Sequence, residues 1–341
     1  MDPVYHLRSC VWEITLACCF SCRYCGSSAG RARAGELDAT ECLEVVEQLA
    51  DLGCRRVSLI GGEVFLRPDW ADIAASVADH GMSAAIVTNG YLISDALIDQ
   101  LKRAQVESVG ISLDGPREVH DRYRQEGSFD RAIQAIGALA GKGIGVSVIT
   151  TVHSENVDHL AEMYEVLRGT DISAWQLQAC SPMGNAAHSG FSTKIDFGEV
   201  IGFVESHNPT APFAVGIADN IGYWSRSEGS LRGAYGSYAP FLGCEAGLTS
   251  IGIDSVGNVR GCESMYDPFF IEGNLRERSL RDIWTDPESF AYNRRFTVDD
   301  LTGRCRGCVH GPICAGGCRS YNYFSHGKLY EAAQCACDEN G

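Results

Sequence analysis

Three cysteines near the N-terminus have the residue type and the spacing of a metal site. Cys18, Cys22 and Cys25 are separated by three and then two residues and directly follow a predicted strand, Val11–Leu16. Three thiolates on one loop can bind three irons of a cubane cluster and leave the fourth iron open, and an open coordination position makes a metal site reactive. Structural zinc, or cysteines that bind no metal, would give the same short pattern, so the surrounding sequence must decide between them.

A second group of cysteines lies toward the C-terminus and contains eight of the 16 cysteines in the chain. They are Cys244, Cys262, Cys305, Cys308, Cys314, Cys318, Cys335 and Cys337. A zinc knuckle needs only two pairs of cysteines, so more than four require at least two sites. Because the sequence shows no secretory signal, these cysteines indicate metal or redox chemistry in a reducing compartment, not disulfide bonds. Three others, Cys19, Cys42 and Cys54, are interpreted as core thiols.

Further candidate residues directly follow other predicted strands. Gly61 and Gly62 remove side chains where a ligand can approach the backbone, and Glu63 offers a carboxylate to a cationic group such as an ammonium. Ser112 and Asp114 alternate at a strand end, so we expect both side chains to face one side, where they suit diol hydroxyls. An ordinary turn between a strand and a helix would explain the same residues.

Strand-like runs alternate with amphipathic helical segments between residue 11 and about residue 206, which is the pattern of repeated β–α units. The predicted strands are Val11–Leu16, Arg56–Ile60, Ser83–Thr88, Ser108–Leu113, Gly145–Val152 and Ala174–Ala179. The predicted helices are Ala39–Leu52, Asp69–His80, Ser94–Arg103, Phe129–Lys142, Asn156–Arg168 and Asp196–Glu205. Such units place reactive groups at the carboxyl ends of their strands. We therefore expect an α/β fold with six parallel strands and the candidate residues at one edge.

The 341-residue chain is acidic, with 28 Lys and Arg against 44 Asp and Glu and a formal charge of −16. This charge disfavours nucleic acid as a partner, because the phosphate backbone is also negative. The sequence contains no apolar run near the roughly 20 residues that span a bilayer, and it has no signal peptide. We therefore expect a cytoplasmic protein with no membrane partner and a length sufficient for about two domains.

Taken together, the N-terminal motifs resemble those of the radical S-adenosylmethionine (SAM) enzymes. The resemblance implies a partial (β/α)6 barrel over residues 1–206. It also implies a 4Fe-4S cluster on the N-terminal cysteine triplet, with an open iron that binds the amino and carboxylate groups of SAM. Reduction of this complex would cleave SAM and produce a 5′-deoxyadenosyl radical, which abstracts a hydrogen atom from the substrate.

The same resemblance assigns SAM binding to a set of residues on the strand-end loops. They are Tyr24, Gly61, Gly62, Glu63, Ser112, Asp114 and Arg124. Tyr24 is expected near the adenine, the turn ending at Glu63 at the methionyl end, and Ser112 at the ribose or carboxylate side. Arg124 matches a family arginine that reaches the SAM carboxylate, and Arg122 is the alternative for that role.

The C-terminal cysteine spacing resembles the SPASM extension of the radical SAM enzymes, here residues 243–341 after a linker or substrate-facing loop at 207–242. By that resemblance one auxiliary 4Fe-4S cluster uses Cys244, Cys262 and Cys318, and a second uses Cys305, Cys308, Cys314 and Cys335. With the N-terminal cluster, this makes three 4Fe-4S clusters. The first auxiliary cluster lacks a fourth cysteine, for which Cys337, Cys10 or a substrate group are alternatives. Cys337 is also an alternative to Cys335.

Two residues are candidates for chemistry on the substrate. Glu263 directly follows Cys262, at the end of a hairpin predicted from Thr249–Ile253 and Val259–Cys262. Sulfatase-maturing members of the family have an acidic residue here that is proposed as a general base, which an oxidation needs in order to remove a proton. A surface acid is the alternative. Cys180 follows the sixth strand, where its S–H hydrogen suits an epimerase that quenches a substrate radical, with a buried structural cysteine as the alternative.

The resemblance favours a radical SAM oxidoreductase that oxidatively modifies a ribosomally made peptide, by dehydrogenation or by a carbon–carbon or thioether crosslink. A flavodoxin- or ferredoxin-type protein is the expected electron donor. Only ten residues precede Val11, which leaves no room for the winged peptide-recognition domain that many such enzymes carry. The alternative substrate is a small sugar or aminocyclitol in antibiotic biosynthesis, acted on by a dehydrogenase or an epimerase. An iron–sulfur electron carrier or a zinc-stabilised binding module is the alternative from another class, although a carrier needs closed sites.

Overall fold

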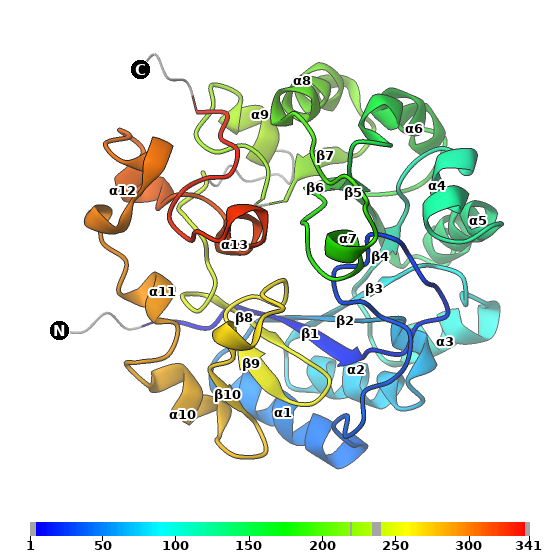
Figure 1. Cartoon of the computed structure of the whole chain (residues 1–341). Coiled ribbons are helices and arrows are strands. Elements are labelled where there is room, and N and C mark those ends of the chain that lie inside the picture. Colours follow the sequence, from blue (N-terminus) through cyan, green and yellow to red (C-terminus); the bar gives the residue numbers. More distant parts are fainter. Residues whose placement is uncertain (1–4, 219, 234–239, 338–341) are drawn as a thin grey trace.

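Ten strands form one continuous sheet in the computed structural model, which describes residues 5–218, 220–233 and 240–337. Their order is β10-β9-β8-β1-β2-β3-β4-β5-β6-β7 (Figure 1). The first six are β1 (Ser9–Thr15), β2 (Arg56–Gly61), β3 (Ser83–Thr88), β4 (Ser108–Ser112), β5 (Gly145–Val152) and β6 (Ala174–Ala179). Each of these strands pairs in parallel with the next one along the chain, so the predicted repeat of β–α units is confirmed.

The long helices between these strands lie on the outer side of the curved sheet (Figure 1). They are α1 (Ala39–Asp51), α2 (Trp70–Asp79), α3 (Asp95–Arg103), α5 (Ser128–Gly141), α6 (Leu160–Leu167) and α8 (Phe197–His207). Helix α1 begins at a capping box, in which the Asp38 carboxylate accepts from the Glu41 N–H at 2.9 Å and the Glu41 carboxylate accepts from the Asp38 N–H at 2.8 Å. Two short helices that the periodicity does not predict, α4 (Arg117–Tyr123) and α7 (Asn185–His188), follow β4 and β6.

The stretch at 207–242, expected as a linker or loop, contributes a seventh parallel strand, β7 (Ala214–Ile217), and helix α9 (Glu228–Arg232). Val215 and Ile217 are buried, which explains why this short run pairs with β6 although its neighbours are rich in Gly and Ser. Residue 219 and residues 234–239 of this stretch lie outside the described residues.

The C-terminal part of the chain extends the same sheet at its other end. Strand β8 (Ser250–Ile253) pairs in parallel with β1, and β9 (Asn258–Arg260) pairs antiparallel with β8, so the predicted hairpin is confirmed. β10 (Gly273–Asn274) forms the edge. The helices that follow are α10 (Leu280–Thr285), α11 (Ala291–Arg294), α12 (Gly311–Cys314) and α13 (Arg319–His326). Figure 1 shows α11, α12 and α13 on the side of the molecule where the sheet does not close, between β8 and β7.

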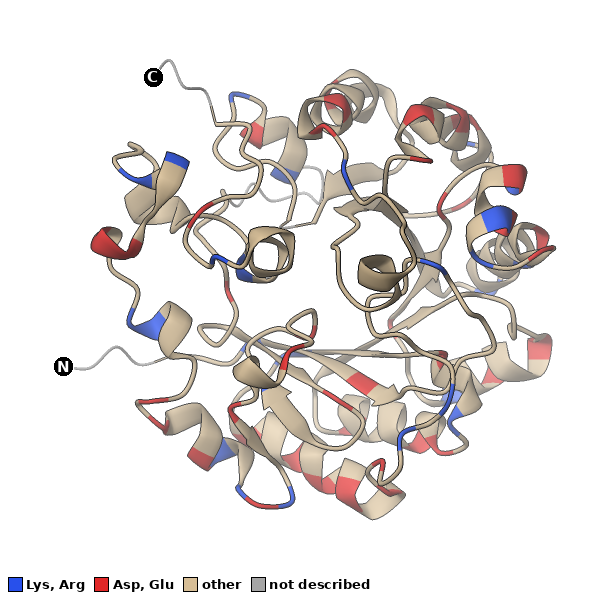
Figure 2. Ribbon diagram, in the orientation of Figure 1, with Lys and Arg blue, Asp and Glu red and all other residues tan. Residues whose placement is uncertain are grey.

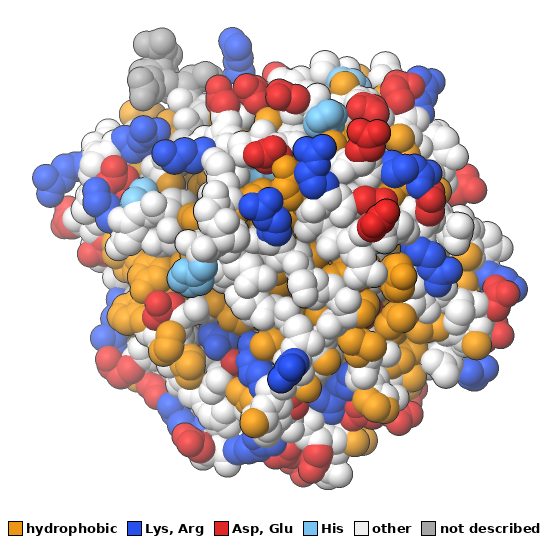
Figure 3. Space-filling model, turned by 45° about the vertical axis from the view of Figure 1, so that its right-hand side comes forward, with side chains coloured by type: hydrophobic (Ala, Val, Ile, Leu, Met, Phe, Trp, Pro, Cys, Tyr) orange, Lys and Arg blue, Asp and Glu red, His pale blue; other side chains and the backbone are white. Residues whose placement is uncertain are grey.

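Short 3-10 helices interrupt the loops. They are η1 (Val64–Leu66), η2 (Val157–His159), η3 (Asn208–Thr210), η4 (Pro268–Phe270), η5 (Val298–Asp300) and η6 (Gly303–Cys305). Acidic and basic residues are interspersed over the outer helices and loops (Figure 2), and the face in Figure 3 carries side chains of both signs of charge. Within the described ranges, no helix has the length and apolar character required to cross a membrane.

Candidate active site

A cavity of about 490 Å³ lies at the carboxyl edge of the sheet and gathers most of the candidate residues. Those that line it are Cys18, Cys22, Tyr24, Cys25, Gly61, Gly62, Ser112, Arg124, Cys180, Cys262 and Glu263. They come from the ends of β1, β2, β4 and β6 and from the hairpin that pairs with β1. The cavity therefore joins the N-terminal cysteine loop to the C-terminal part of the chain.

Hydrogen bonds to its backbone hold the N-terminal cysteine loop in place. The N–H of Cys18 donates to the carbonyl of Gly30 at 3.0 Å, and the Asn185 side chain of α7 donates to the carbonyl of Cys22 at 3.0 Å. The N–H groups of Phe20 and Ala29 donate to the sulfurs of Cys18 (3.4 Å) and Cys25 (3.3 Å), respectively. Backbone donors aimed at sulfur favour thiolate and so fit a cluster ligand. Cys19, which we expected in the core, is exposed, while Cys42 and Cys54 are buried as expected.

Asp114 does not face the cavity, contrary to the expectation for this strand end. Its buried carboxylate accepts hydrogen bonds from the Tyr24 hydroxyl, from Nε of Arg124 and from the Thr151 N–H (2.8 Å). Burial alone would raise the pKa of Asp114, but the charge of Arg124 holds this pKa below its ordinary value. Asp114 therefore positions two side chains that do line the cavity, Tyr24 and Arg124. Arg122, the alternative to Arg124, is exposed.

Glu63 also points away from the cavity, and its carboxylate instead fixes the end of β3. It accepts from the Thr88 hydroxyl at 2.7 Å and from the Asn89 N–H at 3.0 Å. Burial raises the pKa of Glu63 to about 7. The carboxylate was expected to bind a ligand ammonium. Among the described residues, however, Thr88 and Asn89 line the cavity and Glu63 does not.

The two glycines before Glu63 are required by the chain itself. A Cβ on Gly62 would overlap the carbonyl oxygen of Ala17, and a Cβ on Gly61 would overlap that of Thr15. The end of β2 therefore packs directly against the start of the cysteine loop, and both glycines still line the cavity. Their close approach is to backbone, which cannot move aside as a flexible side chain can.

Glu263 lines the cavity although it is only 7% exposed. Its backbone packs on Gly252 of β8, where any Cβ would overlap the Glu263 N–H. Its Oε1 has no hydrogen-bond partner among the described atoms. Burial, and then the charge of Glu13, raise the pKa of Glu263 to about 8.

Behind Glu263 lies a buried network that sequence reasoning missed. The Tyr266 hydroxyl donates to Glu13, and Glu13 also pairs with Arg33. Glu13 is fully buried in β1. The feature of the sequence that could have indicated this network is a single carboxylate in an apolar strand. This network places a second negative charge next to Glu263 and explains part of the rise in its pKa.

Cys180 lines the opposite part of the cavity, after β6, and is 2% exposed. Burial raises the pKa of its thiol to about 12, so it carries its hydrogen at neutral pH. Other polar side chains on the wall were not predicted. They are Thr151, Gln178, Ser181, Asn220 and Ser264.

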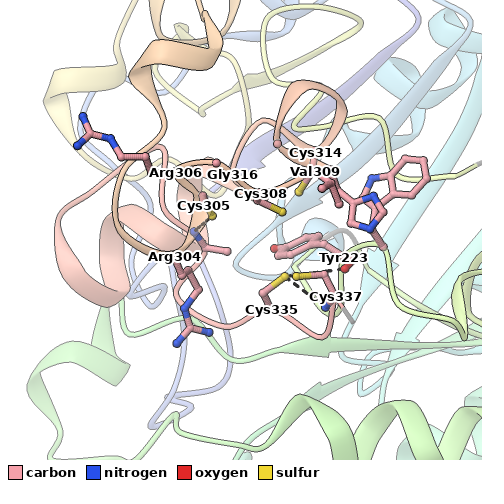
Figure 4. A pocket seen from close by; sticks show the side chains of 15 residues that line it. Tyr223, Arg304, Cys305, Arg306, Cys308, Val309, Cys314, Gly316, Cys335 and Cys337 are labelled. Atoms are coloured by element: carbon pink, nitrogen blue, oxygen red, sulfur yellow. Dashed lines mark hydrogen bonds between the residues drawn. The ribbon is translucent and has the colours of Figure 1, made fainter. Parts of the chain in front are cut away.

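A second cavity, of about 330 Å³, is lined by five C-terminal cysteines (Figure 4). They are Cys305, Cys308, Cys314, Cys335 and Cys337. The Ala332 N–H donates to the sulfur of Cys305 at 3.2 Å, and the Cys337 N–H donates to that of Cys335 at 3.4 Å. The four cysteines expected to hold the second auxiliary cluster thus share one cavity, and so does Cys337, their alternative.

The cysteines expected to hold the first auxiliary cluster lie between the two cavities. Cys262 lines the larger cavity, and Cys244 is close enough for its charge to act on Cys262. The Cys318 N–H donates to the Tyr223 hydroxyl at 3.1 Å, and Tyr223 lines the smaller cavity. Cys10, an alternative fourth ligand, is buried in β1. Across the part of the chain that is described, no three His, Cys, Asp or Glu side chains are arranged to share a single metal ion.

Comparison with protein families identifies two segments of the chain. Residues 12–167 match the radical SAM superfamily. Residues 244–309 match SPASM, an iron–sulfur cluster-binding domain. The first segment contains the N-terminal cysteine loop, and the second contains the hairpin with Cys262 and Glu263.

Curated relatives align over most of the chain. The sequence is 28% identical to the AdoMet-dependent heme synthase of Methanosarcina barkeri, over 95% of this chain and 94% of that protein. It is 29% identical to the mycofactocin maturase MftC of Mycobacterium tuberculosis, over 92% of this chain and 78% of that protein. The Fe-coproporphyrin III synthase of Methanosarcina barkeri is 28% identical, over 94% of this chain and 85% of that protein.

Solved structures share the fold. Streptococcus suis SuiB bound to S-adenosylmethionine superposes with a TM-score of 0.77 at 18% identity, over 98% of this chain and 78% of that chain. Native anSMEcpe with bound AdoMet superposes with a TM-score of 0.71 at 17% identity, over 95% of this chain and 93% of that chain. The partial α/β barrel and the cysteine-rich C-terminal domain therefore recur together in other proteins.

Proposed function

The chain is a radical SAM enzyme with a C-terminal SPASM domain, and from this premise we propose that it oxidatively modifies a ribosomally made peptide. One observation carries the oxidative part of the proposal. Glu263 and Cys262 line the same cavity as the three N-terminal cysteines. A proton acceptor and a ligand of an auxiliary cluster thus face the place where SAM would bind.

The residues around the larger cavity fit SAM and a 4Fe-4S cluster. Cys18, Cys22 and Cys25 would hold the cluster, and the guanidinium of Arg124 would take the SAM carboxylate, while Tyr24 would lie along the adenine. When bound, these groups supply a radical that abstracts a hydrogen atom, and the auxiliary clusters supply an electron acceptor.

Glu263 then provides the remaining part of a two-electron oxidation, which removes a hydrogen atom, a proton and an electron. Its Oε1 is buried and has no hydrogen-bond partner among the described residues, and Glu263 lines the cavity, so this carboxylate has a free acceptor for the substrate proton. A pKa of about 8, raised by burial, lies close to neutral pH, where a general base is most effective. Tyr266 and Glu13 hold the polar surroundings of this carboxylate in place.

We propose three clusters in all, with Cys244, Cys262 and Cys318 on the first auxiliary cluster and Cys305, Cys308, Cys314 and Cys335 on the second. A flavodoxin- or ferredoxin-type protein would supply the electrons for SAM cleavage. The shared cavity of the second set supports its assignment. The domain limits 1–206 and 243–341 belong to the same proposal, whereas the stretch at 207–242 joins the sheet through β7.

A peptide substrate is supported by the relationship to MftC, whose name describes a maturase. A second candidate, an iron porphyrin, is favoured by the relatives named as heme and Fe-coproporphyrin III synthases, the first of which aligns over 94% of its length. A third, epimerisation of a sugar or aminocyclitol, is favoured by Cys180, which lines the cavity.

The candidates differ in the product that each predicts. Reconstituted enzyme with a reductant and SAM would be offered a precursor peptide encoded beside its gene, and separately iron coproporphyrin III. The proposal expects 5′-deoxyadenosine together with peptide that has lost the mass of two hydrogens per modification. Turnover of the porphyrin, with peptide unchanged, would establish the second candidate instead. Product made in deuterated water that has lost no hydrogens and carries one solvent deuterium would identify an epimerase.

A further inference from the structure

Arg319 is a fully buried cation in the C-terminal domain. It is the first residue of α13, directly after Cys318, and it has 0% exposure. Its guanidinium lies over the ring of Tyr330, 4.6 Å from the ring centre, and 5.3 Å from that of Phe296. A cation in such a place is removed from water and must be compensated by other groups.

Only one nitrogen of the Arg319 guanidinium forms hydrogen bonds with the described residues. NH1 donates to the carbonyl oxygens of Ala315, Gly317 (3.4 Å) and Leu329 (3.1 Å). Nε and NH2 have no hydrogen-bond partner among the described residues, and no described carboxylate forms an ion pair with this side chain. Two nitrogens, which carry three N–H donors, and one positive charge are thus left for a group that is not part of the polypeptide.

The backbone that binds Arg319 connects two of the C-terminal cysteines, because Ala315 and Gly317, whose carbonyls accept from NH1, lie between Cys314 and Cys318. Burial lowers its pKa, and the charges of Cys244, Tyr330, Cys318 and Cys314 oppose that effect. Cys244 and Cys318 belong to the set proposed for the first auxiliary cluster, and Cys314 belongs to the set proposed for the second. Arg319 is therefore close to a cysteine of each set, Cys318 and Cys314, and has polar atoms without a partner among the described residues.

We propose that Arg319 is a shared counter-charge that sets the reduction potentials of the two auxiliary clusters. The inference rests on the cluster assignments of the proposed function. A cluster held by thiolates becomes more negative when it gains an electron, so a fixed cation beside it favours the reduced form and raises the potential. Because Arg319 is close to cysteines of both sets, one cation would act on both clusters. Arg319 is a positioning residue, since it touches neither SAM nor substrate.

The test is an anaerobic redox titration of the holoprotein followed by electron paramagnetic resonance, together with an iron count. Arg319→Met removes the charge and keeps an unbranched side chain, while Arg319→Lys keeps the charge. Arg294→Met is the matched control, because Arg294 also stacks on aromatic rings and leaves NH2 unpaired among the described residues. Its hydrogen bonds go to the carbonyls of Gly247 and Trp284 and not to the segment between Cys314 and Cys318.

We expect Arg319→Met to lower the equilibrium constant for reduction of an auxiliary cluster about tenfold. This change lowers the one-electron reduction potential of the cluster by about 59 mV. Arg319→Lys should retain most of the wild-type potential, and Arg294→Met all of it. Wild-type potentials in a fully loaded Arg319→Met protein would overturn the inference. If Arg319→Met loses iron, retention of iron by Arg319→Lys supports the counter-charge, and equal loss from both variants refutes it. Wild-type protein with a single cluster would instead refute the cluster assignments of the proposed function.

Discussion

Glu263 and Cys22 line one cavity, although the two residues are far apart in the sequence. The pairing of β8 with β1 brings them together, since β1 leads into the cysteine loop and β8 begins the hairpin that ends beside Glu263. The SPASM domain thus completes the wall of the radical SAM cavity. The predictions below follow from this arrangement.

Arg124 should matter for both stability and SAM binding, and Arg122 for neither. Arg124→Met removes the partner of buried Asp114, and an unpaired buried charge costs about 3–5 kcal/mol. Urea unfolding should therefore show a loss of this order, and equilibrium dialysis should show weakened SAM binding. Arg122→Met, which changes an exposed residue on the same short segment, should behave as wild type. Equal effects of the two changes would contradict the placement of Arg124.

The contribution of Glu63 to the free energy of unfolding should fall as the pH rises. Burial raises its folded pKa to about 7, above the unfolded value of 4.5, so the folded state binds more protons between these values. The stabilisation is present below pH 4.5 and is lost as the pH rises through 7, an effect of about 3 kcal/mol at most. The difference in unfolding free energy between wild type and Glu63→Gln should fall from pH 5.5 to pH 8. A constant difference would show that Glu63 has an ordinary pKa.

Gly62 should be intolerant of a side chain, in contrast to Gly26. A Cβ at Gly62 would overlap the backbone of Ala17, beside the first cysteine of the loop, whereas a Cβ at Gly26 would meet only the flexible end of Met183. Gly62→Ala should cost about 1–3 kcal/mol and reduce the iron bound by the N-terminal loop. Gly26→Ala should keep its iron. Normal iron content in Gly62→Ala would show that the loop can shift.

Cys335 and Cys337 can be separated by iron content. Both line the smaller cavity, and the proposed cluster uses Cys335. Cys335→Ala should therefore lose about four irons, or leave a degraded cluster with an altered spectrum, while Cys337→Ala retains the wild-type content. The reverse result would assign the cluster to Cys337.

The order of the β–α units could be predicted from the sequence because the periodicity of apolar residues is local. β7 was missed because its four residues lie among Gly and Ser, and the pairing of β8 with β1 was missed because it joins distant parts of the chain. Most of the candidate residues line the cavity, since strand ends and cysteine spacing indicate which loops meet, but several polar residues of its wall were not predicted.

Side-chain direction was less predictable. Glu63 and Asp114 lie on the expected loops but point into the protein, where Thr88, Asn89 and Arg124 take up their charge or hydrogen-bonding capacity. A motif specifies a loop, whereas the direction of a carboxylate depends on partners from other strands. The Tyr266–Glu13 contact was missed for the same reason.

The most direct test of the oxidative mechanism is product formation by Glu263→Gln in deuterated water. The account predicts that this variant still forms 5′-deoxyadenosine but makes the oxidised product 10²- to 10⁴-fold more slowly, the usual loss when a general base is removed. Cys180→Ala should still form the oxidised product. A wild-type rate in Glu263→Gln, with solvent deuterium in the product, would contradict the oxidative mechanism and would show that the enzyme is an epimerase.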